Sequence, residues 1–252
     1  MTDFAFSYTF AGLCDIGKQR SSNQDRIILV PKHDFVAVSD GMGGLRFGEA
    51  SAEYVSGSMP MLMDILAEKC DGNVTPPEAA EMLESAAGTL SDELFKKGNS
   101  PNRFDYGATL AGVWLFDEKA IFVGLGDSRG YVLRDGVLKQ VTEDMNIAGL
   151  LVRNGAMTRE EAEGSPASSR LTAFVGMESP AEPMTWLLEL QPGDRILLCS
   201  DGLYGLVPEG EITGILKEEA PLEELCRKLI GRANENGGRD NISAVVIRIE
   251  EK

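Results

Sequence analysis

The stretch FVAVSDG at residues 35–41 is an apolar, β-branched run that ends in an aspartate and a glycine. The same pattern returns in IFVGLGD at residues 121–127 and in RILLCSDG at residues 195–202. Short apolar runs bounded by turn residues are typical of strands. Strand ends in a layered sheet fold lie at one edge. We therefore expect the aspartates at these ends to approach one another: Asp40, Asp127 and Asp201.

Two further aspartates stand in polar strings, Asp25 in RSSNQD and Asp240 in GGRDNIS. A single Asp-Gly after a strand is most simply a turn, but several acidic strand ends at one edge form a set. Converging carboxylates repel one another and have raised pKa values unless a cation lies among them. Magnesium and manganese prefer oxygen ligands, and Gly41 lets a main-chain carbonyl approach as one more. The sequence thus predicts a divalent-cation site.

Charge and residue types disfavour other kinds of site. Among 252 residues, 24 Lys and Arg face 40 Asp and Glu, and the net charge of −16 disfavours nucleic acid binding. His33 is the only histidine, so a His-rich zinc site cannot form and a Ser-His-Asp triad would depend on this residue. A GxxxxGK match at 12–18 lacks the following Ser or Thr, and the glycines at 41–44 lack dinucleotide-turn spacing.

The cellular location is inferred from what the sequence lacks. No apolar run approaches the roughly 20 residues that span a bilayer. The first ten residues lack the basic and apolar regions of a secretory signal. The four cysteines show neither CxxC spacing nor disulfide-rich density. We expect a cytoplasmic protein with no membrane and no nucleic acid partner.

The chain as a whole predicts one α+β domain over residues 1–252. Strands are expected near 4–10, 26–30, 35–39, 108–116, 120–125, 130–134, 137–141, 184–190, 195–199 and 242–250. Helices are expected at about 47–70, 77–97, 208–218 and 221–235. Pro60 predicts a kink or break in the first helix. Residues 143–183 are polar and punctuated by Gly and Pro, with at most two short helices, and predict a mobile flap.

Six strings resemble the motifs of the type 2C metal-dependent serine/threonine protein phosphatases, and the compact length is similar to their bacterial branch. They are GKQRSSNQD (17–25), SDGMGG with GEAS (39–51), YGATL (106–110), GDSR (126–129), CSDGL (199–203) and RDNI (239–242). Each string alone is weak evidence. Six of them in the family's order cover nearly the whole chain.

The resemblance implies a four-layer αββα sandwich of two antiparallel β-sheets flanked by helix pairs, with a metal centre at one edge. It implies that two manganese or magnesium ions are held there by aspartates and by the Gly41 carbonyl. The aspartates are Asp40, Asp201 and Asp240. It further implies that Asp25 acts through a metal-bound water, and that Asp127, with Asp201, binds a third, weaker ion.

The implied activity is hydrolysis of phosphoserine and phosphothreonine in proteins. Paired divalent ions turn a shared water into a hydroxide that attacks phosphorus in line, so no protein nucleophile is needed. Arg20, five residues before Asp25, matches the arginine that binds the substrate phosphate, for which a guanidinium fork is suited. Phosphorylated proteins and a cognate serine/threonine kinase are the implied partners, and we expect a monomer.

Two positions depart from the family pattern. Met42 stands where some members carry a histidine proposed as general acid, and Asp144-Met145-Asn146 stands in place of Asp-His-Ser. Neither departure removes an expected metal ligand. Two alternatives stay open: a catalytically silent relative that binds phosphoproteins, and a phosphatase of a small phosphorylated metabolite.

Overall fold

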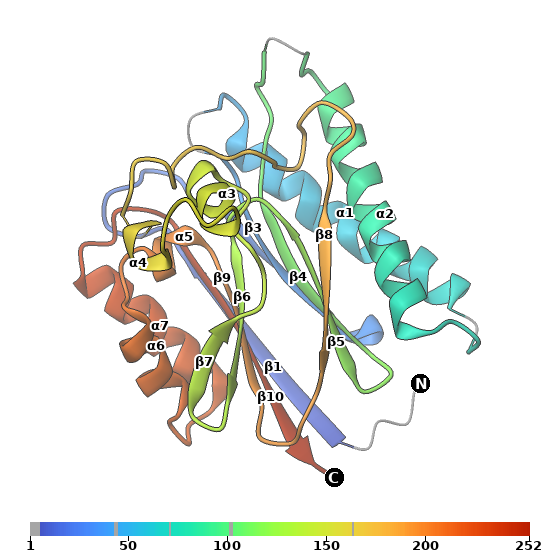
Figure 1. Cartoon of the computed structure of the whole chain (residues 1–252), viewed down its shortest axis with the longest axis vertical. Helices are drawn as coiled ribbons and strands as arrows, with labels where there is room; N and C mark the ends of the chain where they lie inside the picture. The colour runs from blue at the N-terminus through green and yellow to red at the C-terminus, as the bar shows by residue number, and fades with distance from the viewer. Residues whose placement is uncertain (1–5, 43–44, 71, 101–102, 163) are drawn as a thin grey trace.

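The computed structural model describes residues 6–42, 45–70, 72–100, 103–162 and 164–252. Within these ranges, ten strands form two antiparallel five-stranded sheets (Figure 1). The first sheet has the order β1-β10-β9-β6-β7, namely Phe6–Asp15, Ile242–Glu251, Arg195–Cys199, Arg129–Arg134 and Val137–Gln140. The second has the order β2-β3-β4-β5-β8, namely Asp25–Val30, Phe35–Asp40, Leu110–Phe116, Lys119–Leu125 and Met184–Glu189.

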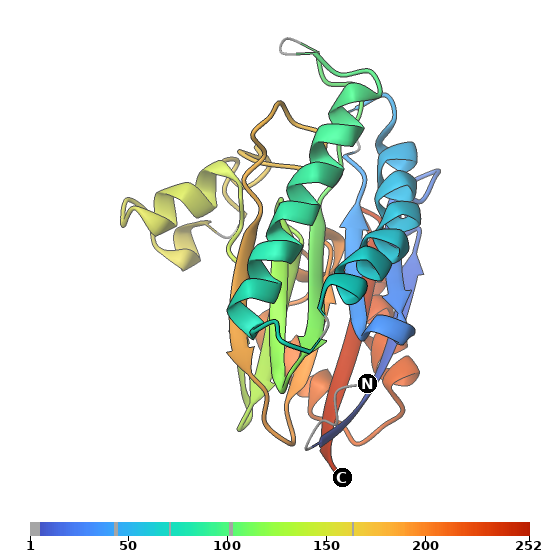
Figure 2. The same cartoon turned by 90° about the vertical axis from the view of Figure 1, so that its right-hand side faces the viewer.

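Helices cover the outer face of each sheet (Figures 1 and 2). Two long helices pack on the second sheet, α1 Gly48–Lys69 and α2 Pro76–Lys96. The first sheet is covered by α5 Asp201–Tyr204, α6 Glu209–Leu216 and α7 Leu222–Glu235. The layers therefore follow the order helix, sheet, sheet, helix, and the expected αββα sandwich is confirmed.

The central strands are buried on both faces. In β5, Ile121 packs toward α1 and α2, whereas its neighbour Phe122 packs between the two sheets with Ile196 of β9. All three side chains are fully buried. A strand covered on both faces needs apolar residues at successive positions, not only at alternate ones. This explains the continuous apolar runs that mark these strands in the sequence.

The sequence predicts a kink or a break at Pro60; helix α1 passes through this residue without a break, and a kink stays a prediction. Proline removes one helical hydrogen bond. Met59 and Met63 on either side of it are buried against the sheet, and this packing keeps the helix continuous. Between β2 and β3, a single 3₁₀ turn, Pro31–His33, forms the connection that the sequence predicts as a hairpin. Phe4 and the pair Gly43-Gly44 lie outside the described residues.

The segment 143–183 contains two short helices, α3 Ile147–Arg153 and α4 Arg159–Ala162, as expected. Figure 2 shows both projecting from the side of the sandwich. The segment is attached to the sandwich at several points. Val175 is fully buried and exchanges both main-chain hydrogen bonds with Ala108. Met145 N donates to the Gly126 carbonyl oxygen at 2.9 Å, and Gly176 N donates to Ser91 Oγ at 2.9 Å. The mobility of the segment stays a prediction. None of the helices in the described ranges has the length and apolar character needed to cross a membrane.

Candidate active site

Strand ends bring five acidic side chains to one edge of the sandwich. Asp25 begins β2 and pairs in register with Asp40, the last residue of β3. Strand β4 is antiparallel to both β3 and β5, so β3 and β5 end at the same edge, and Asp127 follows β5. In the other sheet, Asp201 comes just after β9, and Asp240 comes just before its antiparallel neighbour β10.

The Asp40 carboxyl interacts with all the other members of this group. Burial raises its pKa well above the ordinary value, and the charges of the other four aspartates raise it further. Burial also raises the pKa of Asp25 to about 6, against an opposing hydrogen bond from Ser200. Asp127 has a pKa raised to about 8 by burial and then by the charge of Asp201. Such a group favours either bound protons or a cation.

Two carboxylate oxygens at this edge, Asp25 Oδ1 and Asp201 Oδ1, are buried and have no hydrogen-bond partner among the described residues. The second oxygen of Asp25 accepts a hydrogen bond from Ser200 Oγ at 2.7 Å. A buried acceptor without a donor is costly, and a hard divalent cation suits a set of oxygen donors. The residues present therefore fit such an ion.

Within the described parts of the chain, no three or more His, Cys, Asp and Glu side chains stand in a ready-made metal-binding arrangement. Burial and the charges of the neighbouring carboxylates raise the pKa of Asp40, which favours its protonated form in the metal-free protein. Carboxyl groups that share protons can approach closely without a cation. Ligation of metal ions by these aspartates stays a prediction.

Gly41 lies where the chain leaves no room for a side chain. A Cβ atom at this position would be 2.1 Å from the main-chain oxygen of Gly48, at the start of α1. The Gly41 N–H donates to the carbonyl oxygen of Gln24 at 3.0 Å, which joins the loop before β2 to the end of β3. This close approach requires glycine on packing grounds alone, and the predicted role of its carbonyl as a ligand stays a prediction.

Arg20 is held at the same edge by an ion pair, with its Nη2 at 2.7 Å from Asp240 Oδ2. The Arg20 side chain is 39% exposed, so it is accessible from solvent. Burial raises the pKa of Asp201, and the nearby charge of Arg20 opposes this shift. The sequence-predicted phosphate-binding residue and the predicted metal ligands are therefore neighbours.

Asn241 fixes the loop that carries Arg20. Its Nδ2 donates to the carbonyl oxygens of Ile16 at 2.9 Å and Ser22 at 3.0 Å, and its Oδ1 accepts from Gln24 N at 2.8 Å. The side chain is buried. Asn241 belongs to the RDNI string, but this role could not be predicted for it, because motif spacing gives no indication of which loop a side chain will bind.

Thr109 and Ser128 are further supporting residues to which the sequence analysis assigns no role. Thr109 Oγ1 accepts from the Asp40 N–H at 3.0 Å and lies 2.6 Å from Ser128 Oγ. Both hydroxyl groups are buried. The hydroxyls thus connect the end of β3 to the residue that follows Asp127. A polar residue at the start of a buried strand is the signal that could have identified Thr109.

Replacing Thr109 with valine is expected to lower the free energy of unfolding by about 1–3 kcal/mol, because the buried Asp40 N–H loses its acceptor. Denaturant unfolding of the metal-free protein measures this change. Thr89→Val is a matched control, since the Thr89 hydroxyl donates to the Ser85 carbonyl on the exposed side of α2. An equal loss in both variants would contradict the structural role of the Thr109 hydroxyl.

Comparison with known proteins agrees with this geometry. The family model described as protein phosphatase 2C matches residues 17–246. The serine/threonine phosphatase stp of Listeria innocua is 32% identical over 237 residues, covering 92% of each chain. Protein phosphatase PhpP of Streptococcus pneumoniae is 28% identical and covers 95% of this chain and 97% of that protein.

Solved structures show the same relationship. The serine/threonine phosphatase PstP/Ppp of Mycobacterium tuberculosis superposes with a TM-score of 0.79 at 31% identity, covering 96% of this chain and 99% of that one. A PstP catalytic domain in complex with 2 manganese ions superposes with a TM-score of 0.77 at 29% identity. The match covers 97% of this chain and 99% of that domain. Because the family model covers most of the chain and the fold matches those of solved serine/threonine phosphatases, the chain belongs to the protein phosphatase 2C family.

Proposed function

We propose that this protein hydrolyses phosphoserine and phosphothreonine in proteins at the acidic edge, with two manganese or magnesium ions held by Asp40, Asp201, Asp240 and the Gly41 carbonyl. The observation that carries the proposal is the meeting of five aspartates at one edge, with two buried carboxylate oxygens lacking partners. The related PstP domain in complex with manganese supports the choice of ion.

Bound ions would lower the pKa of a water toward neutrality, and the chemistry they would supply is a hydroxide for in-line attack on phosphorus. Asp25, whose pKa burial raises to about 6, would accept a hydrogen bond from such a water at Oδ1, which has no partner within the described ranges. Ser200 holds the other oxygen of Asp25 and so fixes the direction of the carboxylate. Asp127, with Asp201, is the proposed place of a third ion.

Arg20 is proposed to bind the phosphoryl group of the substrate. Among the residues that the structure describes, its guanidinium pairs with the Asp240 carboxylate alone, which leaves further N–H groups for oxygen ligands. A fixed positive charge beside the attacked phosphorus stabilises the negative charge that develops on its oxygens. Met42 cannot supply a proton to the leaving group, so we propose that this proton comes from solvent at the site.

The partners follow from the reaction. Phosphorylated proteins are the proposed substrates, and a serine/threonine kinase must supply them. The names of the stp and PhpP relatives support a protein substrate over a small phosphorylated metabolite. A catalytically silent relative is disfavoured because all five acidic positions are retained. The monomeric state and the cytoplasmic location stay predictions.

Removal of divalent cations is expected to abolish hydrolysis of a phosphothreonine peptide, because no side chain at the site replaces an activated water. The measurement is phosphate release before and after EDTA treatment and after dialysis into manganese. Activity should return with manganese or magnesium and not with calcium, whose larger size and flexible coordination suit this chemistry poorly. Full activity in EDTA would overturn the proposal. Faster phosphate release from sugar phosphates than from the peptide would favour a small phosphorylated metabolite as the substrate.

A further inference from the structure

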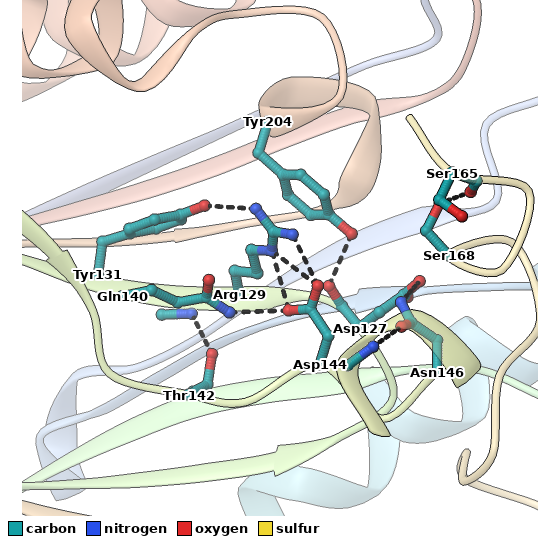
Figure 3. Close-up of polar contacts among 12 residues, drawn as sticks. Asp127, Arg129, Tyr131, Gln140, Thr142, Asp144, Asn146, Ser165, Ser168 and Tyr204 are labelled. Carbon is teal, nitrogen blue, oxygen red and sulfur yellow. Dashed lines mark hydrogen bonds and ion pairs between the residues drawn. The ribbon is translucent and has the colours of Figure 1, made fainter. Parts of the chain in front are cut away.

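The side chain of Arg129 is enclosed by polar and aromatic groups just beyond the acidic edge (Figure 3). It begins β6, two residues after Asp127. Its Nε and Nη2 contact the Asp144 carboxylate at 2.9 and 2.6 Å, and its Nη1 donates to the Tyr131 hydroxyl at 2.9 Å. The Arg129 side chain is 17% exposed and the Asp144 side chain 13%. A largely buried fork of this kind is rigid.

Tyr204 connects this fork to the predicted metal ligands. The guanidinium carbon of Arg129 lies 3.6 Å from the centre of the Tyr204 ring, a close cation–π contact. The Tyr204 hydroxyl donates to the main-chain oxygen of Asp127 at 3.0 Å. Tyr204 also ends the short helix α5, which begins with Asp201. One aromatic ring therefore fixes the distance between the main chains at Asp127 and Asp201.

Asp144, the carboxylate that accepts this fork, belongs to the segment 143–183. It also accepts from Gln140 Nε2 at 2.7 Å. Two residues later, Asn146 caps α3 by accepting from Gly149 N at 2.8 Å, and its amide lies 3.5 Å from Asp127 Oδ2. The side chain of Asp127 thus meets the start of the segment while its main chain is held by Tyr204. Figure 3 shows Tyr204 and Asn146 beside Asp127, whereas Gln140 and Arg129 meet at Asp144.

We propose that Arg129 and Tyr204 are positioning residues that hold Asp127 in place relative to Asp201 for cation binding. The inference rests on the proposed function, since it takes Asp127 as a cation ligand. Groups that orient metal ligands without touching the metal commonly change affinity by about 10–100-fold when they are replaced. Neither side chain needs to contact substrate for this role.

The test is manganese binding to metal-free protein, measured by calorimetric titration. Arg129→Lys keeps the positive charge but loses the two-point contact with Asp144 and the planar group that stacks on the Tyr204 ring. Tyr204→Phe loses only the hydroxyl. Each is expected to weaken the weakest class of manganese sites about tenfold. The double variant should weaken manganese binding little more than the stronger single variant does. Arg129 contacts Tyr204 and Tyr204 contacts Asp127, so both residues act on Asp127 through the same series of contacts. The manganese concentration for half-maximal phosphatase activity should rise in parallel.

Two matched controls separate positioning from general stability. Arg134 lies at the other end of β6 and forms an equivalent fork with Asp194, at 2.8 and 2.7 Å. Arg134→Lys should lower the unfolding temperature and leave manganese binding unchanged. Tyr54→Phe removes a hydroxyl that bonds Glu93 on the outer helices, and should also leave manganese binding unchanged.

The outcomes distinguish this inference from the proposed function. Wild-type protein that binds manganese and hydrolyses phosphopeptide, with Arg129→Lys and Tyr204→Phe titrating as wild type does, would overturn the positioning role alone. Equal weakening in Arg134→Lys would also overturn it, since the effect would then be one of general stability. Wild-type protein that takes up no manganese would overturn both the positioning role and the proposed function.

Discussion

Turnover of a phosphothreonine peptide by Asp201→Asn is expected to fall about 10³-fold or more at saturating manganese, because the variant replaces a charged ligand with a neutral amide. Asp201 is the predicted ligand common to the paired ions and to the third ion. Its Oδ1 is buried without a partner, and its neighbours include Asp40 and Asp240. Steady-state phosphate release and manganese titration are the measurements.

The same substitution should not harm the metal-free fold. Burial raises the pKa of Asp201, so its ionised form is disfavoured by the folded state. Asparagine has nearly the same shape and carries no charge, and it relieves repulsion among the carboxylates. We expect the metal-free variant to unfold at the same temperature as wild type or above it, because charges gathered at an active site often lower the stability of the fold. Loss of turnover with a retained fold would identify ligand loss rather than misfolding.

Asp135→Asn is a matched control for this variant. Asp135 occupies the turn between β6 and β7 with a φ of 51°, a conformation that asparagine adopts readily. It is exposed and remote from the acidic edge. Turnover and manganese binding should stay at wild-type values. Wild-type turnover in Asp201→Asn would show that Asp201 is not part of the catalytic site. Phosphoprotein binding without any turnover in the unmodified chain would favour the catalytically silent alternative.

The fold could be predicted from the sequence because its signals are local. The run at 121–125 is apolar at successive positions, and a strand enclosed by layers on both faces needs this composition. Helix boundaries follow from periodicity to within one or two residues, as in α7. Pro60 does not break α1, because the local cost of a proline is outweighed by burial of the helix face on either side.

The candidate site could be predicted only in part. Aspartates at strand ends and in polar strings are visible in the sequence, and Asp25 pairs in register with Asp40, whereas their roles as ligands stay predictions. The supporting contacts were not predictable from spacing, because they join residues far apart in the chain. Ser200 binds Asp25 across 175 positions, and Tyr204 binds the Asp127 main chain across 77. Such contacts depend on how the two sheets are packed together.

Gly202→Ala is expected to lower the free energy of unfolding by about 3 kcal/mol or more, at the upper end of overpacking effects, and to reduce turnover as well. A Cβ atom at position 202 would lie 1.9 Å from the main-chain oxygen of Asn241 and 3.5 Å from Asp240 Cβ. The obstacle is backbone, which cannot rotate away as a flexible side chain does. Relief requires α5, which begins with Asp201, to move away from Asp240.

Gly231→Ala provides the contrast that makes this prediction specific. Gly231 lies within α7, and a Cβ atom there would meet no other heavy atom within 4 Å. The same added methyl group should therefore stabilise the protein by about 0.5–1 kcal/mol, because alanine favours the helix over glycine. Denaturant unfolding and phosphate release should be measured for both variants. A Gly202→Ala protein with wild-type stability and turnover would show that the approach of Asn241 to α5 is not what holds Asp201 beside Asp240.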